Sequence, residues 1–189
     1  MPKQEGIMLS LKQYIQLDEG NEVQQRVNKH LAKGHSVGTI SPEGPHTDTP
    51  EKSKAAHAKM KSDLESSRKA GKISGWSGPH KGQYQYGSGS HEVAHEGAYV
   101  VHHHDHEAMV SHLKKLGNEH NQETTMHVKP SGEAHYSHLN RSSQKGKEEH
   151  KGKIHYNVPL VQDEGNTKMK RGKTSFTVHN KPPPEPSKD

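Results

Sequence analysis

The chain has 189 residues, of which 25% are hydrophobic, 4% aromatic and 26% charged, and its formal net charge is +5. This length allows one domain or two small ones, and so little apolar material cannot offset the ordering entropy of the whole chain. We therefore expect one folded module, with loosely ordered polar segments, oligomerisation, or both. The absence of cysteine excludes disulfides, thiolate metal sites and cysteine nucleophiles.

The charge and hydropathy patterns bear on partners and location. No apolar run reaches the length of a membrane span, and the first residues lack the continuous apolar stretch of a secretory signal. We therefore expect a soluble intracellular protein without a membrane partner. The 27 Lys and Arg residues are scattered among 22 Asp and Glu residues, with no basic stripe interleaved with aromatic residues. Nucleic acid is for that reason not the expected partner.

Residues 8–33 have helical periodicity. Their later part repeats an apolar residue every fourth position, at Val23, Val27 and Leu31. One interpretation is an N-terminal helix that docks on the domain. The other is that the segment MLSLKQYIQLDE resembles the short amphipathic start of proteins packaged inside phage heads, which is clipped after a Glu, here Glu19.

Residues 35–41 predict a short strand, and the turn cluster that follows it leads to a helix. Thr49 is a good N-cap and Pro50 suits the first helical position, so a helix is expected from there to Gly71.

Residues 73–86 predict two short strand pieces around the turn Ser77-Gly78-Pro79, and 87–95 predict a flexible Gly/Ser/His-rich connection. The apolar run 98–102 is the clearest strand of the chain.

The second half of the module continues the pattern. A helix is expected over 106–119 and a strand over 124–128, with a turn at 130–132 that leads to a strand over 134–139. Beyond residue 140 the chain is polar, with two strand-like islands, at 154–160 and 175–178.

The order β-α-β-β-α-β predicts an α+β fold of the ferredoxin-like type, with an added N-terminal helix and polar, partly disordered tails. We assign 1–34 to an amphipathic helical segment, 35–139 to the ferredoxin-like catalytic domain and 140–189 to a polar C-terminal extension. A four-stranded sheet of this kind has one bare face and open edges, which a symmetric oligomer would cover.

The 19 histidines, above all the run VHHHDHE at 101–107, raise the question of a metal site. His102, Asp105 and His106 could gather at the strand-to-helix turn as ligands. Because histidine is scattered through the chain without regular spacing, exposed compositional bias is the preferred interpretation, and no metal or other cofactor is expected. The sequence has no P-loop, GxGxxG or G-x-S-x-G motif, so a hydrolase triad is not predicted.

Three polar residues adjoin the best predicted elements. Tyr84 lies in the second strand, Glu96 comes just before the strand at 98–102, and Gln122 follows the second helix. A carboxylate beside an apolar strand is costly unless it is paired or functional. The alternative is that Glu96 is a loop residue in water, and the residues alone favour that alternative.

These residues resemble, in their order, the phage-encoded S-adenosylmethionine-degrading enzymes, which are S-adenosylmethionine lyases formerly called hydrolases. The resemblance covers about residues 35–139. It consists of a first strand, a helix with H-x-x-M-x-x-x-L, G-x-Y ahead of E-x-x-x-V, and Q-[DE]-x-x-x-x-V. Here these motifs begin at His57, Gly82, Glu96 and Gln122. The long N-terminal segment and the C-terminal tail depart from the shorter relatives.

The resemblance implies a ferredoxin-like protomer, a trimer with substrate bound between subunits, and a reaction without a cofactor. The substrate's own carboxylate would attack its γ-carbon and yield methylthioadenosine and homoserine lactone. Glu96 and Tyr84 would be the catalytic residues, and Tyr84, Glu96 and Gln122 would bind substrate, with no metal. Glu96 would hold the cationic end, Tyr84 the amino-acid part, and Gln122 would be a supporting amide.

The family setting implies a protein that counters host restriction and methylation, either in the host cytoplasm during infection or packaged in the phage head. Two alternatives stay open. One is a non-enzymatic phage internal-head or host-takeover protein that binds nucleic acid or a host protein. The other is a histidine-rich metal-binding protein.

Overall fold

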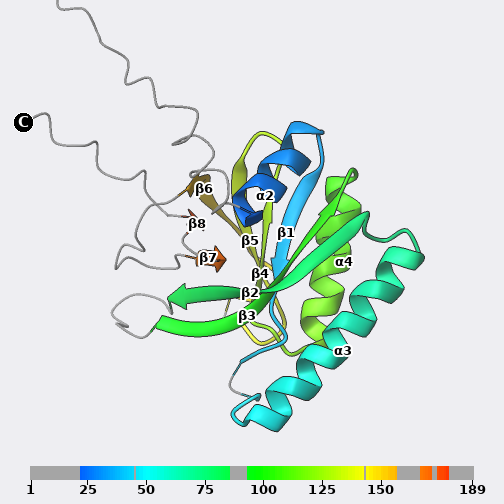
Figure 1. The fold of residues 1–189 in the computed structure, drawn as a ribbon, viewed down its shortest axis with the longest axis vertical. Helices are drawn as coiled ribbons and strands as arrows, with labels where there is room; N and C mark the ends of the chain where they lie inside the picture. Colours follow the sequence, from blue (N-terminus) through cyan, green and yellow to red (C-terminus); the bar gives the residue numbers. More distant parts are fainter. Residues whose placement is uncertain are drawn as a thin grey trace, which may run out of the picture.

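A computed structural model describes residues 22–44, 46–85, 93–142, 144–156, 167–171 and 174–178. The described chain is an α+β structure in which helices pack on an antiparallel sheet (Figure 1). The proposed clipping point at Glu19 and the first part of the predicted helix over 8–33 lie outside the described residues.

The described residues form three helices and eight strands. The helices are α2 (Glu22–Ala32), α3 (Pro50–Lys69) and α4 (His106–Glu119). The strands are β1 (Ser36–Ile40), β2 (Gly75–Gln85), β3 (Val93–His103), β4 (Thr124–Val128), β5 (Glu133–His138), β6 (Glu148–Tyr156), β7 (Thr167–Arg171) and β8 (Thr174–Val178).

Six of the strands lie side by side in the order β2-β3-β1-β4-β5-β6, and the short strands β7 and β8 join β6 to β2, so that the sheet closes into a barrel. Each of the strand pairs is antiparallel. Helix α3 connects β1 to β2, and α4 connects β3 to β4. These two helices lie together beside the sheet, and α2 lies apart from them (Figure 1).

Local sequence signals set the helix starts as expected. The hydroxyl of Thr49 accepts a hydrogen bond from the backbone N–H of Lys52, and Pro50 occupies the first turn of α3. Asp105 caps α4 in the same way by accepting from Ala108 N–H at 3.0 Å. The helices predicted to begin at Pro50 and His106 and the predicted strand over 124–128 are confirmed, and α2 lies within the predicted helix over 8–33.

The two faces of the central strands carry two separate cores, because successive side chains of a strand point to opposite faces. The first core joins α2 to the sheet and consists of Val27, Val37, Ala98, Val100, Met126, Val128, Ala134 and Tyr136, with Leu31 at its border. The second core lies under α3 and α4 and consists of Ile40, Met60, Leu64, Ile73, Tyr99, Val101, Met109, Leu113 and Leu116, with Trp76 at its border.

Two expectations about the sheet need correction. The bare sheet face and open edges are wrong, because the first core fills that face and β5 to β8 continue and close the sheet. The two strand pieces over 73–86 are one strand, β2, whose pairing with β3 shifts register between Ser77 and His80. Pro79 has no N–H to donate to the neighbouring strand, so the pairing of β2 with β3 is irregular at this point. The chain nevertheless continues as one strand and does not turn.

The segment after residue 140 also pairs with the sheet. Strands β6 and β8 overlap the predicted islands at 154–160 and 175–178, and β7 was not predicted. Residues 157–160 lie outside the described residues, and the domain boundary at residue 139 stays a prediction. None of the helices in the described part of the chain combines the length and apolar character needed to cross a bilayer.

Candidate functional site

Glu96 lies inside β3, not in a connection before it. Strand β3 begins at Val93, and Glu96 pairs with Gly82 of β2. By strand alternation its side chain shares the face of Ala98 and Val100, which belong to the first core. The alternative of a loop residue in water is therefore wrong, because the glutamate is half-buried in the sheet.

The environment of Glu96 favours its protonated form. Burial, followed by the nearby negative charges of Glu43 and Glu123, raises the pKa of Glu96 to about 7, although a hydrogen bond from Ser41 acts in the opposite direction. A carboxyl whose pKa lies near neutrality changes charge readily on binding a cation. Perturbed groups of this kind concentrate at functional sites.

Glu43 lies in the turn after β1 and remains ionised. Its carboxylate accepts hydrogen bonds from the hydroxyl of Ser53 and the backbone N–H of Gly97. Burial opposes ionisation, but these hydrogen bonds and His57 hold the pKa of Glu43 below its ordinary value. Glu43 and Glu96 are thus neighbouring carboxyls whose pKa values are displaced in opposite directions, a pattern typical of sites that handle charge.

A histidine links Glu43 to the core. His57 on α3 places Nε2 at 3.2 Å from Oε1 of Glu43 and Nδ1 at 2.9 Å from the hydroxyl of Tyr99. A Cβ atom on Gly97 would lie 2.6 Å from the His57 ring, so the close approach requires glycine at that position. Burial, followed by the charge of Glu43, raises the pKa of Tyr99 to about 12, so its hydroxyl stays protonated.

Gln122 lies beside this network. Its Nε2 donates to the carbonyl of Glu43 at 2.9 Å and to the carbonyl of His120 at 3.3 Å, and the side chain is buried. The amide thereby ties the start of β4 to the turn that carries Glu43. Its observed contacts are those of a positioning residue.

Tyr84 can be placed by its backbone alone. It pairs with Ala94, and Gly82 pairs with Glu96 two residues further along. Positions 84 and 96 are therefore diagonal neighbours on adjacent strands, which lie about 7 to 8 Å apart in antiparallel sheets. The structure thus brings Glu96 and Gln122 near the same turn, with position 84 one strand away.

The metal ligands considered in the histidine run are separated. His102 points towards α2, where its ring stacks on His30. His106 lies at the start of α4, with Nδ1 2.9 Å from the Ser36 hydroxyl, and Asp105 is the helix cap. His102, Asp105 and His106 therefore do not converge on one point.

Sequence reasoning missed Glu43 as a member of the site. The signal that could have found it is a carboxylate in a Ser-Pro-Glu-Gly turn at the end of a buried strand, where loops often carry functional side chains. Its importance depends on contacts with Ser53 and Gly97, which are distant in sequence.

The assembled site consists of ionisable and hydrogen-bonding groups around Glu96. The carboxylates create a negative potential suited to a cation. Ser41 and Gln122 donate hydrogen bonds to the backbone carbonyls of Gly97 and Glu43, and His57 contacts the Glu43 carboxylate. Neither a family model nor a curated protein matches this chain.

Proposed function

We propose that this protein degrades S-adenosylmethionine to methylthioadenosine and homoserine lactone. The observation that carries the proposal is the half-buried Glu96, which has Glu43 and Glu123 as charged neighbours. S-adenosylmethionine carries a sulfonium and an ammonium, and both are stabilised by negative potential. The choice of this substrate among cations rests on the resemblance of the motifs at His57, Gly82, Glu96 and Gln122.

The reaction requires no group from the protein to form a covalent bond. An oxygen of the substrate's carboxylate attacks its γ-carbon, the bond between that carbon and sulfur breaks, and the electron pair passes to sulfur. The sulfonium becomes the neutral thioether of methylthioadenosine, and the ring closes as homoserine lactone. The protein supplies the bent substrate conformation and a partly dehydrated, oriented environment.

Each proposed site residue has a separate role. Glu96 would bind the cationic amino-acid end, and the bound cation would favour its ionised form. Tyr84 would hydrogen-bond the same part of the substrate. Gln122 would hold the turn of Glu43 in place, since its amide donates to the Glu43 carbonyl.

We further propose that β1-α3-β2-β3-α4-β4 is a ferredoxin-like unit. Its support is the strand order β4-β1-β3-β2 with antiparallel neighbours and one helix in each crossover. A trimer with substrate between subunits, active in the host cytoplasm or packaged in the phage head, completes the proposal. The trimer is proposed from the resemblance alone, because the first core fills the sheet face that was expected to be bare.

Product analysis tests the activity. Purified full-length protein is incubated with S-adenosylmethionine, and methylthioadenosine and the four-carbon product are followed by chromatography and mass spectrometry. Water labelled with ¹⁸O separates the two reaction types, since hydrolysis at the γ-carbon would put the label in the homoserine hydroxyl and lactone formation would not. Folded protein that yields no methylthioadenosine would refute the proposal.

A further inference from the structure

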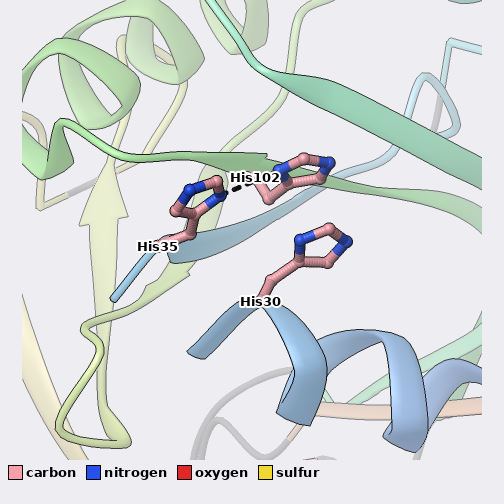
Figure 2. A group of neighbouring side chains, drawn as sticks. All are labelled: His30, His35 and His102. Carbon is pink, nitrogen blue, oxygen red and sulfur yellow. Dashed lines mark hydrogen bonds between the residues drawn. The ribbon is translucent and has the colours of Figure 1, made fainter. Parts of the chain in front are cut away.

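Three histidines from separate elements meet between α2 and the sheet. His30 comes from α2, His35 from the residue before β1, and His102 from β3. Each offers a ring nitrogen, and these nitrogens lie within 4.8 Å of one another. Figure 2 shows the ring of His30 below the pair formed by His35 and His102.

We propose that His30, His35 and His102, here called the α2 histidine site, bind a divalent zinc-class ion that fastens α2 to the sheet. Imidazole nitrogen suits zinc, and three such ligands leave a fourth position for water or another side chain. The site is independent of the Glu96 network, which contains none of these residues.

The spacing of His35 and His102 fits a shared ion. Their Nδ1 atoms lie 3.4 Å apart. Two nitrogens bound to tetrahedral zinc at 2.0 to 2.1 Å are separated by about 3.3 Å. The two atoms face each other along the dashed line of Figure 2, so small shifts would place an ion between them.

The third ligand has a free coordinating atom. Nδ1 of His30 is buried and has no hydrogen-bond partner. The His30 ring stacks on His102 with centroids 3.5 Å apart and planes 15° apart. Because stacked rings direct their lone pairs in parallel, His30 must turn to meet the ion, and turning breaks no hydrogen bond at Nδ1.

The surroundings of His30 and His102 disfavour the protonated imidazole, which cannot bind a metal ion. Burial, followed by His30 and His35, lowers the pKa of His102 to about 4, and burial and cationic neighbours lower the pKa of His30. Both rings are therefore neutral at pH 7. The charges of Arg26, Lys29 and Lys33 near His30 oppose a cation, so affinity would come from the directional nitrogen contacts.

Gly75 of β2 makes room for this arrangement. It pairs with His102 across the strands, and a Cβ atom at position 75 would lie 2.6 Å from Nε2 of His102. Strand alternation also explains why one residue of the histidine run contributes here. His103 points to the opposite face, where its Nδ1 lies 2.9 Å from the Ser74 hydroxyl.

Metal titration of the full chain tests the site. Protein freed of metal with a chelator is titrated with Zn²⁺ by calorimetry and with Co²⁺ by visible absorption, which reports tetrahedral coordination. Hydrogen exchange of residues 22–32 is then compared with and without Zn²⁺. We expect one tight equivalent, a tetrahedral Co²⁺ spectrum and slower exchange in α2.

Variants separate the α2 histidine site from background binding by other histidines. His102→Gln and His30→Gln should each weaken the tight equivalent by more than about tenfold, the loss that altering even an outer partner of a metal ligand can cause. His135→Gln is the matched control, since His135 is a half-buried histidine stacked on His127 outside the site. His30 lies at the edge of α2, so its variant serves if His102→Gln does not fold.

Two results would overturn the proposal. One is zinc binding by His30→Gln and His102→Gln that equals binding by the His135→Gln control. The other is a tight equivalent that leaves hydrogen exchange in α2 unchanged, since an ion held by residues from α2, β1 and β3 must restrain the helix.

Discussion

Glu43 and Glu96 lie close enough that the charge of Glu43 helps to raise the pKa of Glu96 to about 7. The arrangement is built by the sheet, since Gly97, next to Glu96, donates its backbone N–H to the Glu43 carboxylate. Burying two neighbouring carboxyl groups costs free energy. Pairs of this kind, which favour opposite protonation states, are concentrated at functional sites.

Glu96→Gln should abolish most of the proposed activity. The amide keeps the size of the side chain but cannot carry the negative charge that would stabilise the substrate cation. We expect kcat/KM to fall by about two to three orders of magnitude, comparable to the loss of a direct electrostatic contact in a transition state. Glu51→Gln, an exposed change in the first turn of α3, is the control and should retain wild-type turnover. Full turnover by Glu96→Gln would remove Glu96 from the site.

The pH dependence of kcat/KM should follow Glu96. Its pKa of about 7 in the free protein predicts activity that rises with pH to a plateau above that value. Glu43→Gln removes a neighbouring negative charge, so the midpoint should move to lower pH. Both proteins act on the same substrate, so ionisation of the substrate cancels in the comparison. Identical midpoints in two folded proteins would show that Glu43 does not act on Glu96.

The stability of the folded protein should also depend on pH through Glu96, but in the direction opposite to that of the activity. Its pKa is raised from 4.5 to about 7 in the folded state, so folding binds a proton between these values and wild-type stability falls as pH rises through them. Glu96→Gln escapes this loss. Urea unfolding should therefore give equal stability near pH 4 and a gain by the variant of up to about 3 kcal/mol at pH 8. A gain that does not change with pH would contradict the charge-burial explanation.

Acid should destabilise the protein through His127. This histidine is buried in β4, and burial, followed by the charge of His106, lowers its pKa from 6.5 to about 4. The unfolded chain binds the proton first, so stability is lost as pH falls from 6.5 to 4, by at most about 3 kcal/mol from this residue. His127→Gln should show a shallower acid loss in denaturant unfolding than the exposed control His104→Gln. Equal slopes would exclude His127 as the source.

Local signals in the sequence predicted the helical parts of the fold well. Thr49 with Pro50 marked the start of α3, and the apolar spacing of Met109 and Leu113 marked the buried side of α4. The closure of the sheet was not predictable in this way. Strands β6 and β7 are rich in lysine and lack clear alternation, and β8 is only five residues long. The closure depends on the pairing of β7 with β2, which is distant in sequence.

The candidate site was predicted only in part, because some of its contacts also join residues that are distant in sequence. Glu96 and Gln122 were identified because they adjoin clear elements. Glu43 and the contact of His57 with Tyr99 depend on the approach of α3 to β3, which is 42 residues away along the chain for that pair. The α2 histidine site likewise depends on register, because strand alternation selects His102 and excludes His103.

The most direct test of the proposed function is the amount of methylthioadenosine formed from S-adenosylmethionine at pH 8 by wild-type protein and by Glu96→Gln, both confirmed as folded by circular dichroism. We predict rapid product formation by wild type, with homoserine lactone in equal amount, and little or none by the variant. No product from wild type, or equal product from both proteins, would contradict the account.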